Sequence, residues 1–258
     1  MSYVYRVDAD IADTQPCAAG PWGAGLQHGG APASLIAWVA ERTPARGPMR
    51  VARITVDLLR PVPIARLEIR TQVVREGRKI QLLSVSLLHE SVEVVRASVL
   101  KVREEALMLP QTAAEEKVTL PGPERGAPTE GVLGDNAAAF IKGLELRVVK
   151  GAFREPGPAA IWFRAHRPII EGEPIAPLMR VATAADFCNG VSSVLDFRSW
   201  TFINADLTIS LARMPVGEWI LLDARSWLDG GSGIAFAKLG DQRGYFGRAV
   251  QSLVIERR

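Results

Sequence analysis

Polar residues that can do chemistry occur at three places in the sequence where the neighbours are mostly apolar or small. Gln251 lies inside the strand-like segment AVQSLVI, where a buried carboxamide needs hydrogen-bond partners. Asp186 opens the segment DFCNGV, and its carboxylate can accept a proton or cap a helix. His28 precedes Gly29 and Gly30, where the lack of side chains lets a substrate approach the backbone. These residues are the candidates for a site.

The His28 segment allows two interpretations. The backbone N–H groups of His28, Gly29 and Gly30 can hold an oxyanion at the start of a helix, and the imidazole can donate to a substrate. Equally, His28 can be a histidine whose hydrogen bonds are satisfied within a loop. Both interpretations stay open at the level of sequence.

Metal and disulfide chemistry have little support in the sequence. Cys17 and Cys188 are far apart and in no Cys/His cluster, so neither a zinc site nor a disulfide framework is expected. His89 and His166 show no ligand spacing. A reducing cytosol is the expected location.

Composition excludes several classes of protein. The chain has 258 residues, of which 48% are hydrophobic, enough for one large core or two linked smaller ones. Lys and Arg number 31 against 28 Asp and Glu, and no block of like charge argues for a nucleic-acid partner. A slight basic excess suits a small ligand that bears phosphate. No signal-peptide pattern or long apolar run predicts a leader or a membrane span.

The sequence contains an internal repeat. When Arg60 is aligned with Arg213, a proline follows each arginine within two residues, and Ile80 and Ile234 follow at 20 and 21 residues. The segments RASVLKV and RAVQSLVI then begin 36 and 35 residues on. Four landmarks in register over about fifty positions indicate a tandem duplication.

Each copy of the repeat is expected to hold antiparallel strands and one helix. Alternation predicts strands at 51–60, 67–75, 79–89 and 92–103, with hairpin turns in the second copy at 228–233 and 240–244. Helices are expected at 29–43, with Pro32 in the first turn, and at 183–197, with Asp186 as a possible cap. The predicted organisation is a first repeat over 1–103, a linker over 104–136 and a second repeat over 137–258.

One long helix across an antiparallel sheet, occurring twice, predicts an α+β fold of the double hotdog type. The chain also resembles the acyl-CoA thioesterase II family and its thioesterase-like relatives. The resemblance rests on HGGAPASLIAWVAE, VDLLRPVPIARLEIRTQVVREGRKI, AADFCNG, FINADLTISLARMPVGEWILLDARS and GRAVQSLVI. These pieces follow the family order over nearly the whole chain except the linker.

The resemblance implies hydrolysis of a fatty acyl-CoA thioester to a free acid and CoA, with no metal or other cofactor and no acyl-enzyme. By position it implies that Asp186, Asn204 and Gln251 hold and activate one water. Several relatives carry a hydroxyl residue where this chain has Asn204, and Thr208 is the nearest hydroxyl. His28, Gly29, Gly30 and Thr208 are the candidate substrate-binding residues. Val51 and Val99 stand opposite Asn204 and Gln251 in the first copy, so one site is expected.

Two other functions stay open. A non-catalytic acyl-binding protein that kept the fold is favoured by the departure at Asn204. A hotdog enoyl-CoA hydratase is disfavoured because such enzymes pair an Asp with a His five residues on, and FCNGV lacks it. Exposed sheet edges in this type of fold favour a homo-oligomer.

Overall fold

The computed structural model describes residues 2–23, 25–108, 110, 117–129, 138–152 and 155–258. The first half contains, in chain order, β1 (Tyr5–Asp8), β2 (Ile11–Thr14), the 3-10 turn η1 (Pro16–Ala18), α1 (Gly30–Arg42), β3 (Met49–Leu58), β4 (Arg66–Glu76), β5 (Ile80–His89) and β6 (Val92–Arg103). The second half contains η3 (Pro123–Arg125), β7 (Ala127–Pro128), η4 (Ile141–Gly143), β8 (Leu144–Lys150), β9 (Ala159–Ala165), α2 (Pro177–Ala185), α3 (Cys188–Val191), β10 (Trp200–Asn204), β11 (Asp206–Leu211), β12 (Trp219–Asp229), β13 (Ser232–Gly240) and β14 (Tyr245–Arg257).

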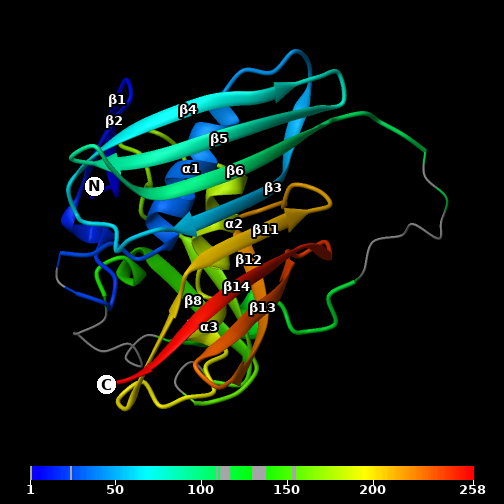
Figure 1. Ribbon diagram of the computed structural model, residues 1–258. Helices are drawn as coiled ribbons and strands as arrows, with labels where there is room; N and C mark the ends of the chain where they lie inside the picture. The colour runs from blue at the N-terminus through cyan, green and yellow to red at the C-terminus, as the bar shows by residue number, and fades with distance from the viewer. Residues whose placement is uncertain (1, 24, 109, 111–116, 130–137, 153–154) are drawn as a thin grey trace.

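The strands of both halves join into one antiparallel sheet. Within the described residues its order is β1-β2-β4-β5-β6-β3-β11-β14-β13-β12-β9-β8-β7, and β10 also pairs with β14. Strands β4-β5-β6-β3 of the first half therefore correspond to β12-β13-β14-β11 of the second. The sheet curves around α1 and α2, and both chain ends lie on the same side of the molecule (Figure 1).

The two halves meet at β3 and β11 with an internal two-fold relation. Thr55 pairs with Thr208, and its neighbours Ile54 and Val56 pair with Ile209 and Leu207. The offset of 153 positions that aligns Arg60 with Arg213 also aligns Thr55 with Thr208, whose Oγ1 atoms lie 3.2 Å apart. Each of these threonines therefore pairs with its own counterpart, as a duplicated unit with two-fold symmetry requires.

The helices differ from the prediction. The expected helix at 29–43 is α1, with 13 residues. The helix expected at 183–197 is not continuous: α2 has nine residues and overlaps this range only at 183–185, and α3 has four residues. The prediction of a long helix in each repeat is thus not confirmed. Pro177 begins α2 earlier than expected, and Asp186 follows its last residue, so the interpretation of Asp186 as an N-cap is wrong.

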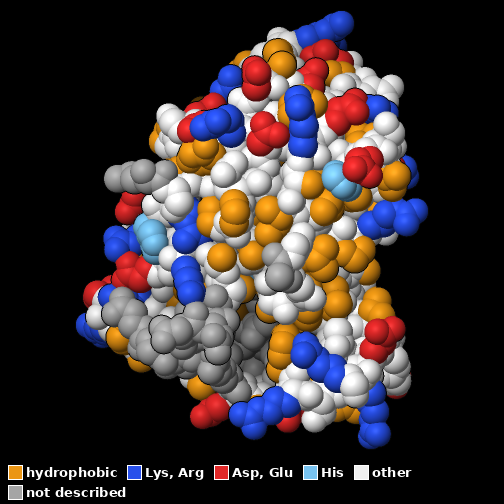
Figure 2. Space-filling model, turned by 90° about the vertical axis from the view of Figure 1, so that its left-hand side faces the viewer, with side chains coloured by type: hydrophobic (Ala, Val, Ile, Leu, Met, Phe, Trp, Pro, Cys, Tyr) orange, Lys and Arg blue, Asp and Glu red, His pale blue; other side chains and the backbone are white. Residues whose placement is uncertain are grey.

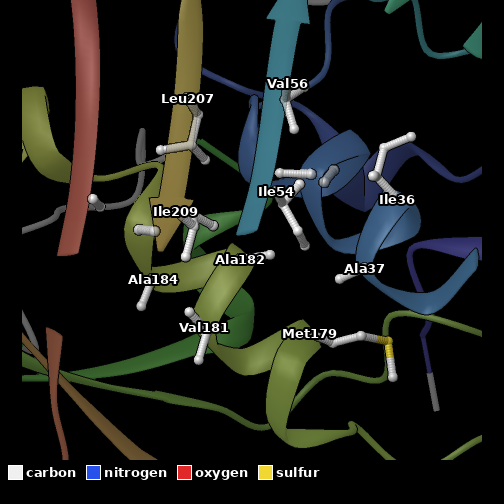
Figure 3. Packing of buried hydrophobic residues seen from close by; sticks show 14 of the residues in the cluster. Ile36, Ala37, Ile54, Val56, Met179, Val181, Ala182, Ala184, Leu207 and Ile209 are labelled. Atoms are coloured by element: carbon white, nitrogen blue, oxygen red, sulfur yellow. The ribbon is translucent and has the colours of Figure 1, made fainter. Parts of the chain in front are cut away.

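Helices α1 and α2 pack on each other beneath the central strands. Ser34 Oγ donates to Gly30 O (2.6 Å) within α1 and lies 2.7 Å from Thr183 Oγ1 of α2. Small side chains such as Ala37 and Ala182 let the two helices approach closely. Figure 3 shows side chains of β3 and β11 pointing at these helices, which places the core between sheet and helices.

Part of the expected linker is docked on the second half. Val118 and Leu120 pack against Trp162 and Leu221, and Trp162 Nε1 donates to Pro121 O (2.8 Å). The described residues of the segment 104–136 thus include a surface excursion that covers an apolar patch.

None of the helices among the described residues has the length and hydrophobicity of a membrane-spanning segment.

Asp241 holds the turns at one end of the second half together. Its carboxylate accepts two hydrogen bonds from Arg213 (2.6 and 2.8 Å) and others from the N–H groups of Val216, Arg243 and Gly244. The side chain is fully buried. Burial alone would raise the pKa of Asp241, but Arg213 and the three backbone N–H groups outweigh burial, so the pKa is lowered.

We predict that Asp241→Asn lowers the free energy of unfolding by about 3 kcal/mol at neutral pH, because Arg213 loses a buried partner. The pKa of Asp241 is lower in the folded state than in the unfolded state. Its contribution to the free energy of unfolding is therefore complete above the unfolded-state pKa and is lost as pH falls through the folded-state pKa. The difference between wild type and variant should therefore shrink in acid. Urea unfolding at several pH values measures it, with Asp229→Asn in an exposed position as control. A pH-independent difference would contradict this account.

Candidate functional site

Asp186 lies at the centre of a cluster formed by residues from four parts of the chain. Asn204 Nδ2 and Gln251 Nε2 donate to its Oδ1 at 3.0 and 3.3 Å, and His28 Nδ1 lies 3.0 Å from its Oδ2. The Asp186 side chain is only 4% exposed. The structure therefore brings together the three residues that the resemblance selected and adds His28 from the other half.

Gln251 occupies the break between α2 and α3. Its Nε2 donates to Asp186 O (3.0 Å), and its Oε1 accepts from Asn189 N (3.0 Å). In an uninterrupted helix, Asn189 N–H would donate to Ala185 O, four residues earlier. The carboxamide of Gln251 thus takes over a backbone hydrogen bond, and its polar atoms are engaged with the protein. This contact sets the position of Asp186.

Asn204 ends β10 and points into the cluster. Its Nδ2 also donates to Asp206 O (3.3 Å), whereas no donor among the described residues contacts its Oδ1. Asn204 is nearly buried, at 6% exposed. Its free carbonyl oxygen is therefore an acceptor available to a water or a ligand.

Thr208 does not join the cluster. Ala205 separates β10 from β11, so the buried positions change from Phe202 and Asn204 to Leu207 and Ile209. Thr208 consequently faces the outer side of the sheet, where it contacts Thr55 on the two-fold axis. The candidate substrate-binding residue Thr208 therefore lies apart from Asp186, Asn204 and Gln251.

His28 is held in place by aromatic rings and by its loop. The imidazole stacks between Phe140 and Phe187, with ring centroids 5.0 and 4.4 Å away. The backbone N–H of His28 donates to Ala18 O (2.9 Å). The preceding residue, Gln27, is buried and donates to Pro63 O (2.7 Å). The side chain of His28 keeps 12% exposure, so the ring is fixed but reachable.

The Nδ1 atom of His28 has two possible hydrogen-bond partners. Nδ1 lies 3.0 Å from Asp186 Oδ2 and 3.1 Å from the nitrogen of Gly30, whose N–H donates to Nδ1 when that atom carries no proton. A protonated Nδ1 donates to the carboxylate instead. The two roles of Nδ1 exclude each other, because one atom cannot accept from Gly30 and donate to Asp186 at the same time.

The two glycines let Asp186 approach the start of α1. A Cβ on Gly29 would lie 2.8 Å from both carboxylate oxygens, and one on Gly30 would lie 3.0 Å from the Phe140 ring. Gly29 is the N-cap of α1, so the carboxylate lies at the positive end of the helix. The N–H of Gly29 donates to no described acceptor, which leaves it available for an oxyanion.

A small cavity lies beside the cluster. It has a volume of about 10 Å³, which is close to the space for one water. Its walls are Asn189, Ser193, Val194, Leu195, Phe202, Ser226, Leu228 and Leu253. Asn189 and Phe202 connect it to the site, since Asn189 Nδ2 donates to Phe202 O (3.2 Å) and Asn189 N to Gln251.

Cys188, two residues after Asp186, has no thiolate to offer. Burial raises its pKa far above the usual range, and the negative charge of Asp186 adds to the effect. Sequence reasoning missed Asn189, Phe140 and Phe187. Asn189 stands in the quoted segment DFCNGV and is the one with a signal, a polar residue three positions after Asp186.

Each half is an antiparallel sheet with a helix packed on it, and the two halves join where β3 pairs with β11. This arrangement defines a double hotdog protein. Solved structures with this fold cover nearly the whole chain. A hot dog protein of unknown function from Alicyclobacillus acidocaldarius has a TM-score of 0.77 at 14% identity, covering 98% of this chain and 95% of its own. Acyl-CoA thioesterase II TesB2 from Mycobacterium marinum has a TM-score of 0.69 at 14% identity, and the match covers 98% of this chain and 95% of its own. The tesB protein of Mycobacterium avium subs paratuberculosis has a TM-score of 0.71 at 15% identity, and the match covers 97% of this chain and 95% of its own.

Sequence comparison gives the family. The model of the acyl-CoA thioesterase N-terminal domain matches residues 18–102, and that of the C-terminal domain matches 115–255. The chain belongs to the acyl-CoA thioesterase family. A search of curated proteins found no match.

We predict that Gly29→Ala disrupts the cluster, because the added methyl group must displace the Asp186 carboxylate. Overpacking of this kind costs about 1–3 kcal/mol of unfolding free energy. Gly25→Ala, in the same loop with no atom within 4 Å of its new Cβ, is the matched control. Urea unfolding and a crystal structure of each variant measure the effect. Equal stability of the two variants, with Asp186 unmoved, would contradict the close approach.

Proposed function

We propose that the chain hydrolyses the thioester bond of an acyl-CoA to a free acid and CoA at the Asp186 cluster. Membership of the acyl-CoA thioesterase family supports the reaction class. The observation that carries the proposal is the convergence of His28, Asn204 and Gln251 on one buried carboxylate.

In this mechanism the Asp186–His28 pair takes a proton from water. The water oxygen attacks the carbonyl carbon, the C–S bond breaks, and the thiolate leaves with a proton returned from the pair. We assign the proton to the pair because three donors already contact the oxygens of Asp186, whereas His28 Nε2 has no contact among the described residues. Asn204 Oδ1 orients the water, and Gly29 N–H donates to the oxyanion.

Gln251 acts as a positioning residue in this proposal. Its oxygen accepts from Asn189, and its nitrogen donates to Asp186, so it holds the carboxylate instead of contacting water directly. In this proposal the roles divide: the Asp186–His28 pair and Asn204 act on the water, and Gln251 supports Asp186.

The His28–Asp186 contact also favours a second candidate, hydration of an enoyl-CoA. That reaction adds the water oxygen to the β-carbon and a proton to the α-carbon, so it needs an acid and a base together. The sequence lacked a histidine five residues after Asp186, but His28 from the first half lies 3.0 Å from that carboxylate. Thiol release supports hydrolysis, and loss of enoyl absorbance without thiol release supports hydration.

The predictions of cytosolic location and of a homo-oligomer remain part of the proposal. The two cysteines are unpaired, as is usual in a reducing compartment. On the outer face of the second half, Trp227, Val250 and Val254 are exposed, and burying them between copies would be favourable.

We predict that Asp186→Asn lowers turnover of acyl-CoA by about 10²-fold or more, because the variant lacks the carboxylate that takes the proton with His28. Thiol release with a chromogenic reagent measures the rate, across acyl chains of several lengths. Asp229→Asn, an exposed change of the same type, is the control. Turnover that stays within twofold of wild type would remove Asp186 from the mechanism.

His28→Asn tests whether the imidazole takes part in proton transfer. An asparagine amide can still donate to Asp186 Oδ2 but takes up no proton at neutral pH. We expect a loss of about 10²-fold in kcat with a changed pH profile. A loss below about tenfold with the wild-type profile would limit His28 to holding Asp186. Wild type that binds acyl-CoA without releasing thiol would instead favour the non-catalytic acyl-binding alternative.

A further inference from the structure

Three aromatic side chains form a rim beside the site. Trp22, in the loop before His28, lies with its ring centroid 5.8 Å from that of Phe197, which in turn meets Phe202 edge to face at 5.4 Å. Phe202 also forms a wall of the cavity next to Asn189. This aromatic rim therefore joins the two halves of the chain next to the small cavity, and Phe197 is 40% exposed.

Positive charge surrounds the aromatic rim. The guanidinium of Arg258 lies 4.5 Å from the ring of Phe197, and that of Arg257 lies 5.3 Å from Trp200. Both arginines and Arg198 are exposed. On the face in Figure 2, Lys and Arg side chains stand next to hydrophobic ones in the lower part of the surface.

Two carboxylate side chains, Asp196 and Glu256, lie near these three arginines, but in the part of the chain that the structure describes neither forms an ion pair with them. Neither Arg257 nor Arg258 belongs to any ion pair formed between described residues. Asp196 is close by, but its Oδ1 accepts from the backbone N–H of Arg198 (2.9 Å). Glu256 lies between the strand positions of Ile255 and Arg257 and pairs with Thr201 across the sheet.

We infer that Trp22, Phe197, Arg257 and Arg258 bind the phosphorylated nucleotide end of a coenzyme A thioester. Adenine stacks on exposed aromatic rings, and guanidinium groups bind phosphate with two N–H donors. Rings and guanidinium groups together match a ligand that carries a base and phosphates. Phe202 links the rim to the cluster, because its backbone oxygen accepts from Asn189, whose backbone N–H donates to Gln251. The inference rests on the proposed function, since it places the non-reacting end of the same substrate.

The experiment compares an acyl-CoA with the same acyl group on pantetheine, which lacks the nucleotide. The measured quantity is the ratio of kcat/KM for the two substrates. In the double variant Arg257→Ala/Arg258→Ala the ratio should fall by roughly tenfold, the scale for losing hydrogen bonds to a charged group. High salt should lower the wild-type ratio as well, because it screens exposed charges. Arg78→Ala, an exposed arginine in the β4–β5 turn, is the control and should leave the ratio unchanged.

A second variant and a binding measurement keep the test decisive. Trp22→Leu removes the aromatic surface contributed by the first half and should lower the ratio severalfold. This variant provides the test if the double variant folds poorly. Calorimetric titration with free CoA needs no turnover and should show weaker binding for both variants. A ratio unchanged in both would overturn the inference while leaving hydrolysis intact. Wild type that binds CoA through these residues but hydrolyses neither thioester would uphold the inference and overturn the proposed function. No binding and no turnover would end both.

Discussion

The contact between the Gln251 carboxamide and the break after α2 is the constraint on which the site depends. One amide group accepts from Asn189 and donates to Asp186, thereby replacing a backbone hydrogen bond of a continuous helix. A buried helix end without such a partner would leave unpaired polar groups. Because Gln251 supplies that partner from β14, the chain can turn at Asp186 and direct its carboxylate at the start of α1.

The two halves share a plan and differ where chemistry is located. Val99 stands at the position of Gln251 in the first copy, and there α1 runs unbroken over 13 residues. The second copy has the amide, the break and the acid. The first copy contributes the glycine turn and His28, which approach that acid across the interface. Symmetry thus provides the frame, and a few unlike residues make one site.

Much of the fold followed from patterns within the sequence. The repeat and the strands were predictable because landmarks recur and strands alternate. The grouping of Asp186, Asn204 and Gln251 came from the family resemblance instead. The helix break was not predictable, since it depends on Gln251, 65 residues from Asp186. The orientation of Thr208 depends on one extra residue, Ala205, and the rings around His28 come from two segments that are far apart in the sequence. Contacts between distant segments decided what local preference left open.

The Thr55–Thr208 pair on the two-fold axis has a consequence for how the molecule stays assembled. In a protein made of two separate single units, β3 against β11 would be a boundary between subunits, lost on dilution. Here the intervening chain acts as a tether and keeps the partners at an effective concentration of about millimolar or more. A centre whose acid and imidazole come from different units can therefore persist at any protein concentration.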